Sequence, residues 1–390
     1  MKLVIDGVFF GSAQTGCARI WASILPRLAR YPDLDVVLLD RGDCPSVDGI
    51  EKVEFPPYAR RGNTAADSLL VDKLCTELGA DVFCSTYYTT PATIPSVLMV
   101  YDMAPEALGF GLRWRVDKEK QVAISFASYY ACVSESVRSD LERFYPSVGN
   151  DRAFVTQCGV ERKIFAPRGA AEVESFKTTF GITKPYYLLI GSREEHAGYK
   201  NASLAFEAVA RMRALEFELL RVGGEAEIQD DALRGLPANV SACRMDLTDD
   251  ELARAYSGAE ALVYPTFYDG CGMPVVEAMA CGCPVISTKG GALGEVAGEA
   301  ALFVTGRDPD ELRRKMEQVR EPGQRQTLIN EGLKQASRYG WDAMARGLHY
   351  LLTKAVEESK NQVTQAFFQE WERLRAIQAE VETAWQTWQV

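Results

Sequence analysis

Residues 264–304 read YPTFYDGCGMPVVEAMACGCPVISTKGGALGEVAGEAALFV, the most informative stretch of the chain. Short apolar runs at 261–264 and 284–287 flank a turn, as buried parallel strands do. Glycines and a proline between residues 270 and 274 break the chain just before an apolar helical pattern begins at Val275. Strand, turn and helix in this order predict one unit of a parallel α/β sheet.

Two carboxylates, Asp269 and Glu277, lie eight residues apart around this turn. Backbone N–H groups at a glycine turn and helix start form an anion site. The residues that would supply them are Gly270, Cys271, Gly272 and Met273. A sugar diphosphate suits such a site, and we expect Glu277 in the first helical turn to accept hydrogen bonds from hydroxyls. The alternative is an ordinary strand–turn–helix unit without a ligand.

The segment DGCGMPVVE, residues 269–277, resembles the carboxylate-x7-carboxylate signature of glycosyltransferase family 4. The following ACGCPVIST and GGALGEVAG match that family's usual continuation. Members are retaining, nucleotide-sugar-dependent enzymes of the GT-B fold. Asp269 stands where glutamate is more common and Cys271 where phenylalanine is usual, and both departures would tune the pocket for the donor sugar.

A second segment, LLIGSREEHAGYKN at 188–201, is similar to the family's strand and loop that carry cations for the donor diphosphate. Arg193 and Lys200 hold those positions, and Gly191 ends the strand. A departing nucleoside diphosphate gathers negative charge, which fixed cations stabilise. Arginine does so bidentately and lysine as a point charge. Taken alone, the segment is also compatible with two solvated loop cations.

The N-terminal half resembles the family less strictly. Gly11–Gly16 stands where members carry a glycine-rich loop near the donor phosphates and acceptor, so the resemblance assigns Gly16 to the donor site. VLMVYDMAPE at 97–106 resembles the family's strand ending in His-Asp, with Tyr101 in place of the histidine and Asp102 retained. This version looks like the branch that includes mannosyltransferase-like enzymes. Tyr101 can donate a hydrogen bond but does not titrate near neutral pH.

The resemblance implies a reaction and roles for these residues. Glu277 would bind the ribose, Arg193 and Lys200 the diphosphate, and Asp269 the transferred sugar. A hydroxyl acceptor, on a glycan, a lipid-linked glycan or a small molecule, would enter near Tyr101 and Asp102. The acceptor hydroxyl would attack the sugar from the same face that the leaving group leaves, so the configuration would be retained. The resemblance implies neither a metal nor another cofactor.

Apolar runs and amphipathic patterns alternate along the chain. We expect strands near 3–5, 36–39, 82–85, 97–100 and 130–133, then 187–190, 218–222, 261–264, 285–287 and 301–304. We expect helices near 18–30, 65–78, 113–128 and 135–144, then 202–213, 249–256, 275–280 and 309–320. Two such series predict two doubly wound parallel-sheet domains joined by a link at Ile164–Lys184. Ligands bind at the carboxyl ends of such strands, so we expect the active site in the cleft between the domains.

With the resemblance, the chain divides into four parts. These are an N-terminal acceptor-side domain at 1–165, a C-terminal nucleotide-sugar-binding domain at 166–340, a helix at 341–357 that crosses back to the N-terminal domain, and an amphipathic helical extension at 358–390.

Composition excludes several other classes. A formal net charge of −11 argues against broad binding to a nucleic-acid backbone. The ten cysteines are scattered and lack zinc-site spacing, and only two histidines are present, so buried, reduced thiols are favoured over a metal site. No run approaches the roughly 20 apolar residues needed to cross a bilayer. We expect a cytoplasmic protein, free or peripheral at the membrane.

The C-terminal extension carries an apolar stripe at spacings of three and four. The stripe consists of Phe367, Trp371, Leu374, Ile377 or Gln378, Val381, Trp385 and Trp388. Packing on the parent domain is the first interpretation, and self-association through this helix is the second. Docking on a membrane surface fits less well, because interfacial helices favour cations and this one is rich in glutamate.

Two rival functions remain open. One is a GT-B enzyme of different chemistry, such as an epimerase or a phosphorylase, which would need other catalytic residues. The other is a non-catalytic GT-B protein that binds a sugar nucleotide or a partner, an interpretation to which Tyr101 gives weight. The pattern favours a glycosyltransferase acting in glycan or polysaccharide assembly.

Overall fold

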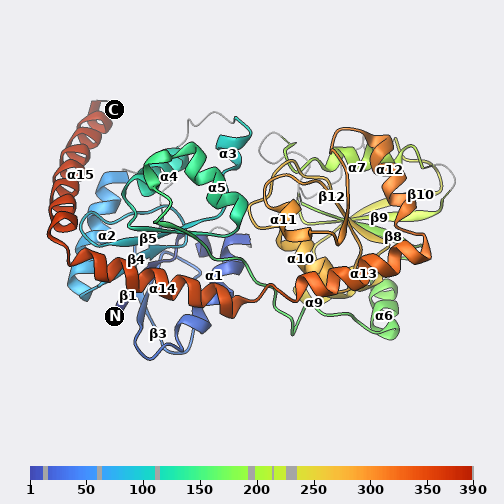
Figure 1. Ribbon diagram of the computed structural model, residues 1–390, viewed down its shortest axis with the longest axis horizontal. Coiled ribbons are helices and arrows are strands. Elements are labelled where there is room, and N and C mark those ends of the chain that lie inside the picture. Colours follow the sequence, from blue (N-terminus) through green and yellow to red (C-terminus); the bar gives the residue numbers. More distant parts are fainter. Residues whose placement is uncertain are drawn as a thin grey trace. The chain divides into compact units, whose positions relative to one another are not determined.

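The structure is a computed structural model that describes residues 1–11, 16–58, 64–109, 115–191, 198–212, 215–224 and 235–388. The chain divides into two compact units (Figure 1). Unit 1 comprises residues 1–158 and 341–390, and unit 2 comprises residues 159–340. Residues 159–165, which the sequence analysis assigned to the first domain, belong to unit 2 because Val160 and Phe165 are buried in its core.

Unit 1 is built on a parallel sheet that has seven strands in the described part of the chain, in the order β3-β2-β1-β4-β5-β6-β7. The strands are β1 (Lys2–Asp6), β2 (Asp35–Asp40), β3 (Ile50–Glu54), β4 (Val82–Ser85), β5 (Ser96–Val100), β6 (Tyr129–Cys132) and β7 (Ala153–Val155). The central strands β1 and β5 carry unbroken apolar runs between their ends and are buried, as a sheet covered on both faces requires.

Helices cover both faces of this sheet. They are α1 (Gly16–Leu28), α2 (Thr64–Leu78), α3 (Ala104–Ala107), α4 (Arg115–Phe126), α5 (Glu135–Phe144), α14 (Trp341–Ser359) and α15 (Gln362–Trp388), with short 3₁₀ helices at Val8–Gly11 and Pro146–Val148. α14 packs against α1 and strands β4 to β6, whereas α15 runs along α2 (Figure 1). The helices α14 and α15 therefore belong to unit 1, together with the N-terminal strands.

Unit 2 repeats the architecture with a parallel sheet in the order β10-β9-β8-β11-β12-β13. The strands are β8 (Tyr186–Ile190), β9 (Phe217–Val222), β10 (Val240–Met245), β11 (Ala261–Tyr264), β12 (Val285–Ser287) and β13 (Ala301–Phe303). The helices are α6 (Ala170–Phe180), α7 (Ala202–Val209), α9 (Asp249–Gly258), α10 (Met273–Ala280), α11 (Leu293–Ala297), α12 (Pro309–Gln318) and α13 (Pro322–Ala336). One apolar core lies under α6, α9, α10 and α11, and a second lies under α7 and α12. The prediction of two doubly wound parallel sheets is confirmed.

The segment predicted as a link, Ile164–Lys184, is not a linker, and that prediction is wrong. It contains α6, whose Phe176 is buried in the core of unit 2. The glycines that suggested a linker are its ends: Gly169 precedes the first turn, with Glu172 bonding back to its N–H, and Gly181 closes the helix with φ +67°. Glycine in a left-handed conformation terminates helices in this way.

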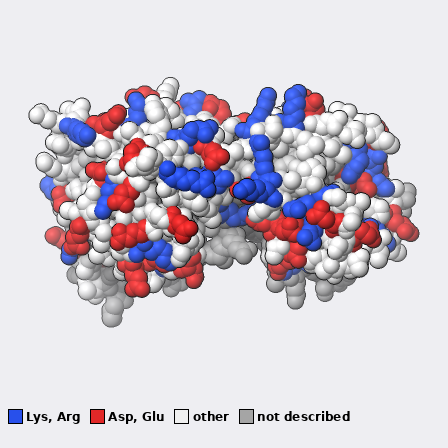
Figure 2. All heavy atoms as spheres, turned by 90° about the horizontal axis from the view of Figure 1, so that it is seen from below, with Lys and Arg blue, Asp and Glu red and all other residues white. Residues whose placement is uncertain are grey.

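The C-terminal stripe does not coincide with the face that packs on unit 1. In α15 the buried side chains are Phe368, Trp371 and Arg375, and only Trp371 belongs to the predicted stripe. The remaining described stripe residues stay exposed. No helix in the described part of the chain is long and apolar enough to cross a membrane. Figure 2 shows one face of the protein, where basic and acidic side chains are mixed on both units.

Candidate active site

The loop that follows β11 is organised by the side chain of Asp269. Its Oδ1 accepts hydrogen bonds from the backbone N–H groups of Cys271 (3.1 Å) and Gly272 (2.7 Å). Gly272 has φ +60° and precedes α10, a conformation that glycine adopts without strain. The carboxylate therefore closes the turn and sets the start of α10.

The other carboxylate oxygen meets a cation and a phenol. Asp269 Oδ2 accepts from Tyr264 Oη (2.7 Å) and from Lys200 Nζ (3.0 Å), and Lys200 Nζ also lies 3.2 Å from Tyr264 Oη. The side chains of Lys200 and Asp269 are only 18% and 11% exposed. We call Lys200, Tyr264 and Asp269 the Lys200 cluster. It lies at the carboxyl ends of the neighbouring strands β8 and β11.

Two members of the Lys200 cluster, Lys200 and Asp269, are ionised at neutral pH. Burial alone would raise the pKa of Asp269, but Lys200, Tyr264 and the Gly272 N–H hold that pKa below its ordinary value of 3.8. Burial alone would lower the pKa of Lys200, but the Asp269 carboxylate holds it well above 10.5. Burial and the Asp269 charge raise the pKa of Tyr264 well above its ordinary value, so its hydroxyl keeps its proton. The cluster presents a fixed ammonium.

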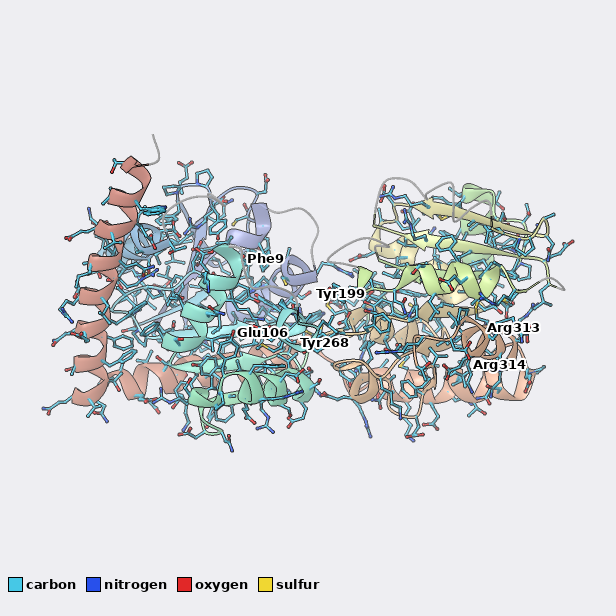
Figure 3. All side chains as sticks on the ribbon, turned by 90° about the horizontal axis from the view of Figure 1, so that it is seen from above. Phe9, Glu106, Tyr199, Tyr268, Arg313 and Arg314 are labelled. Carbon is cyan, nitrogen blue, oxygen red and sulfur yellow. The ribbon has the colours of Figure 1, made fainter. Side chains whose placement is uncertain are left out.

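Backbone contacts fix the loop that carries Lys200. The carbonyl of Tyr199 accepts from Phe267 N (2.9 Å) and from Thr266 Oγ1 (3.1 Å), which ties this loop to the one after β11. Figure 3 shows Tyr199 and Tyr268 at the same end of unit 2, away from Arg313 and Arg314 of α12.

Asn201 adds a second anchor for the same loop. It adopts a left-handed conformation with φ +57°, and its Nδ2 donates to the carbonyls of Pro265 (3.0 Å) and Gly306 (2.8 Å). Gly191, which ends the strand before the loop, has φ +105° and lies against the Lys200 side chain. The loop that carries the Lys200 ammonium is therefore fixed by Gly191 before it and by Asn201 after it in the chain.

Two glycines after β12 let a third loop approach the Asp269 turn. A Cβ at Gly290 would lie 2.0 Å from the carbonyl oxygen of Phe267, and one at Gly291 would lie 2.3 Å from that of Asp269. The N–H of Ala292 donates to the Asp269 carbonyl at 2.8 Å. The GGALGEVAG segment thus packs directly against the Asp269 turn and hydrogen-bonds to it.

Glu277 lies in α10, but not where the sequence analysis placed it. α10 begins at Met273 rather than Val275, so Glu277 is in the second turn and not the first. Its side chain is 5% exposed. Of the four turn residues predicted to offer N–H groups, Cys271 and Gly272 donate to Asp269, whereas the N–H groups of Gly270 and Met273 donate to no acceptor in the described part of the chain. These two remain available to an anion at the helix start.

All but one of the predicted site residues of unit 2 lie in the described part of the chain. Gly191, Lys200 and Asp269 come together, and the turn at 270–273 links them to α10 and Glu277. Arg193 lies outside the described residues.

In unit 1, Tyr101 is an internal residue. It is 6% exposed, and its hydroxyl accepts from Trp21 Nε1 (2.6 Å) and donates to the Thr86 carbonyl (2.8 Å). Burial raises the pKa of Tyr101 well above its ordinary value. Both of these hydrogen bonds tie α1 and the loop after β4 to the end of β5, which indicates a positioning residue.

Asp102 and Gly16 lie at element ends. Asp102 Oδ1 accepts from Ala104 N (3.0 Å), and its carbonyl accepts from Lys120 Nζ (3.0 Å). Lys120 also forms a buried ion pair with Glu106 at 2.8 Å. Gly16 is exposed at the first position of α1. The two residues are thus close to the ends of secondary structure, as the resemblance implies for a ligand site.

Replacing Tyr101 with phenylalanine is expected to destabilise the protein by about 1–3 kcal/mol, because the buried Trp21 N–H loses its acceptor. Urea unfolding measures this, with Tyr350→Phe on the exposed side of α14 as the matched control. Unchanged stability together with lost activity would show instead that the hydroxyl contacts the substrate.

The cysteines and acids form no metal site in the described part of the chain: no three His, Cys, Asp or Glu side chains are grouped to hold an ion. Each of the ten cysteines is a thiol rather than half of a disulfide. Burial raises the pKa of Cys283 to about 12 and that of Cys84 to about 12, so both stay protonated.

Sequence analysis missed two residues of this site, Tyr264 and Asn201. Tyr264 was interpreted only as the end of an apolar strand, and Asn201 was not considered. A tyrosine as the last residue of a strand at the ligand-binding edge was the available signal for the first. The contacts of Asn201 span 64 and 105 residues, and no local pattern reports them.

Part of the chain is similar in sequence to known proteins. A profile of the family described as Glycosyl transferases group 1 matches residues 184–321, which hold the Lys200 cluster and α10. The chain is 26% identical to O-antigen chain mannosyltransferase B of Escherichia coli over 58% of its own length and 61% of the relative. It is 29% identical to MMP alpha-(1->4)-mannosyltransferase of Mycolicibacterium hassiacum over 63% of its length and 58% of the relative. The match thus spans less than two thirds of either relative.

Solved structures match over more of the chain. A sucrose-phosphate synthase from Thermosynechococcus elongatus superposes with a TM-score of 0.72 and 17% identity, covering 91% of this chain and 98% of that one. Anabaena HepE in complex with UDP-glucose gives 0.70 and 16%, covering 91% and 100%. Two doubly wound units with this likeness define a GT-B protein. Residues 184–321 are similar to the family described as Glycosyl transferases group 1, and the solved structures share the fold of the whole chain.

Proposed function

We propose that this protein is a retaining glycosyltransferase that moves a sugar from a nucleotide-sugar donor to a hydroxyl of an acceptor in glycan assembly. The observation that carries the proposal is the Lys200 cluster, a buried ammonium fixed beside the start of α10. Leaving-group charge is stabilised best by preorganised cations and dipoles. Two of the most similar relatives are named as mannosyltransferases, and one solved neighbour holds UDP-glucose.

The proposal assigns partners to the diphosphate and to the ribose of the donor. Lys200, with Arg193, neutralises the diphosphate, and the free N–H groups of Gly270 and Met273 bind its oxygens at the helix start. Glu277 accepts from the ribose hydroxyls. Unit 1 binds the acceptor with Gly16 and Asp102 near its reacting hydroxyl.

The role of Asp269 follows from its contacts. Both of its oxygens already accept two hydrogen bonds each. A sugar hydroxyl at Asp269 would have to replace one of these donors. We therefore assign Asp269 chiefly to holding Lys200 and the turn, so that it orients the cation rather than binding the sugar directly. No metal is needed for this arrangement, because protein cations meet the diphosphate.

A thermal-shift screen tests the donor site. UDP, GDP, ADP and their sugar derivatives are added to the wild-type protein and to Glu277→Ala, with Glu299→Ala, an exposed residue after α11, as the control. A ligand at 100 times its Kd stabilises the folded state by about 2.7 kcal/mol. We expect one base to raise Tm in the wild type and control and to lose that shift in Glu277→Ala. No shift with any nucleotide would favour a non-catalytic protein.

A further inference from the structure

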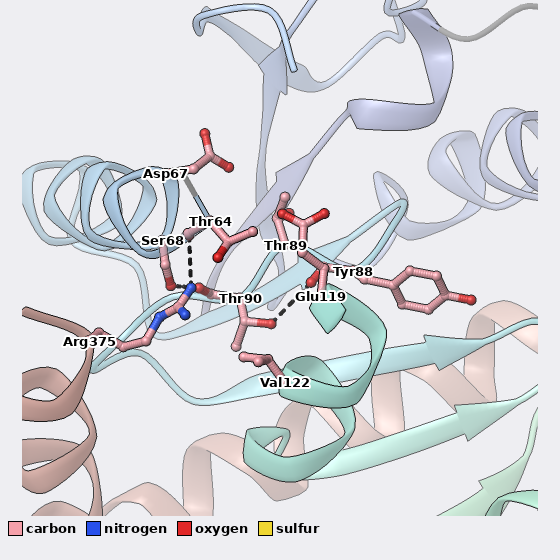
Figure 4. A pocket seen from close by; sticks show the side chains of 9 residues that line it. All are labelled: Thr64, Asp67, Ser68, Tyr88, Thr89, Thr90, Glu119, Val122 and Arg375. Atoms are coloured by element: carbon pink, nitrogen blue, oxygen red, sulfur yellow. Dashed lines mark hydrogen bonds between the residues drawn. The ribbon is translucent and has the colours of Figure 1, made fainter. Parts of the chain in front are cut away.

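One face of α15 is committed to unit 1. The indole of Trp371 stacks on Phe126 with ring centroids 3.5 Å apart, and its Nε1 donates to the Pro91 carbonyl at 3.1 Å. Arg375 reaches into a small pocket beside α2 and donates to the Thr64 carbonyl at 2.8 Å (Figure 4). These contacts fix the rotation of α15 about its axis.

That rotation leaves an apolar row facing solvent. We call it the α15 stripe: Val363 (77% exposed), Phe367 (42%), Leu374 (43%), Ile377 (46%), Val381 (63%) and Trp385 (67%). The spacings of three, four and seven residues place these side chains on one side of the helix. From Val363 to Trp385 the stripe runs about 33 Å at 1.5 Å per residue. Exposed apolar side chains over this length, interrupted by Glu370 between Phe367 and Leu374, mark an interaction site.

The charges beside the stripe disfavour a lipid surface. Glu370, Glu372 and Glu380 are exposed on α15, whereas Arg373 is exposed and Arg375 is buried against unit 1. Interfacial helices need cations on their polar face to meet anionic lipids. An acidic helix with one exposed cation suits a protein partner instead.

The stripe is complementary to itself in the antiparallel direction. When Leu374 faces Ile377 of a second copy, the same two-fold axis brings Phe367 to Ala384 and Trp385. The flanking Arg373, which pairs with Glu370 of its own helix, then also faces Glu380 of the other copy, and the contact occurs twice by symmetry. Opposite charges beside an apolar seam select the partner and the direction of paired helices. A self-complementary patch is what a two-fold dimer requires.

We propose that α15 is a dimerisation helix that pairs antiparallel with α15 of a second copy through the α15 stripe. One pair of helices of this length gives an interface at the small end of the range for specific complexes, so we expect a Kd in the micromolar range. The inference rests on unit 1 alone and does not depend on the donor chemistry.

Sedimentation equilibrium of the full-length protein from about 1 to 100 μM tests the proposal, a range that brackets the expected Kd. We expect a concentration-dependent rise from 43.1 kDa toward twice that mass. Leu374→Glu with Ile377→Glu should hold the protein at the monomer mass with unchanged circular dichroism, because both residues are exposed in the monomer. Thr383→Glu, which adds charge to the opposite side of α15, is the control and should still dimerise.

Charge reversal tests the register. Arg373→Glu and Glu380→Arg should each weaken the dimer by roughly 3-fold or more, as loss of a charge pair and a new repulsion do, and the double variant should recover it. The two residues are seven positions apart on one helix, so direct pairing within one chain does not account for the recovery. A monomer mass at every concentration would overturn the proposal. So would a dimer that survives the Leu374 and Ile377 substitutions, or a stripe that instead binds vesicles of anionic lipid.

Discussion

Replacing Lys200 with methionine is expected to lower kcat/KM by about 10²–10³-fold, the cost of removing one preorganised charge-stabilising group. The ammonium is buried, ionised and held by Asp269 and Tyr264. In the proposed function it would therefore meet the leaving diphosphate without reorganising. Methionine keeps most of the side-chain volume and removes the charge together with its hydrogen bonds to Tyr264 and Asp269. Release of nucleoside diphosphate from the donor identified by the thermal-shift screen measures the loss.

The variant also leaves the Asp269 carboxylate without its cation, so a control must separate catalysis from stability. Lys200→Met with Asp269→Asn removes both charges and keeps the size of each side chain. If the loss of activity reflects the missing cation, the double variant stays as inactive as the single one while its Tm recovers. Recovery of activity along with Tm would contradict the proposed role and make Lys200 a structural residue.

The surroundings of Lys200 show which parts of the site could be predicted from the sequence and which could not. The turn at 269–274 and the helix behind it were predictable, since glycine, proline and apolar spacing are local signals. The partners of Lys200 are 64 and 69 residues away along the chain and become visible only when β8 and β11 are paired. The sequence motif indicated where the candidate site lies. The contacts among Lys200, Tyr264 and Asp269 followed only from the pairing of β8 with β11.

The same distinction holds for the fold. Central strands such as β5 (SVLMV) were predicted because burial on both faces demands an unbroken apolar run. The edge strands β3 (IEKVE) and β10 (VSACRM) were missed because exposed edges carry polar residues. α15 was predicted as a helix, but the face that packs on unit 1 was not predicted. That face is set by the contacts of Trp371 and Arg375 with unit 1 rather than by the apolar stripe.

Replacing Arg41 with methionine is expected to destabilise the protein by about 3–5 kcal/mol, the cost of breaking a buried ion pair from one side. Arg41 follows β2 and bonds Asp6 at the end of β1 through Nε (2.7 Å) and Nη2 (2.8 Å), and it reaches Asp67 at 3.0 Å. The side chains of Arg41 and Asp6 are 1% and 0% exposed. Nothing in the sequence flagged this network, since its members are far apart in the chain.

Calorimetry measures this effect, with the exposed Arg30→Met as the control, which should change the unfolding free energy by less than about 0.5 kcal/mol. For a unit of this size, 3–5 kcal/mol corresponds to a Tm lower by about 6–20 °C. A drop no larger than that of the control would show that the pair adds nothing beyond the packing of Arg41 on Phe55.

The pH dependence of the loss identifies its cause. Burial raises the pKa of Asp6 from 3.8, and Arg41 opposes that rise. Without Arg41 the folded-state pKa rises further, so the variant is stable while Asp6 is protonated and loses stability as pH climbs above 3.8. The gap between wild type and variant should therefore widen from acidic toward neutral pH. Adding Asp6→Asn, which cannot ionise, should recover part of the loss at neutral pH. The stability difference between Asp6→Asn and the double variant should then carry no contribution from Asp6 titration. A gap that is constant in the Arg41→Met single variant would mean that the lost hydrogen bonds, rather than the uncompensated charge, set the cost.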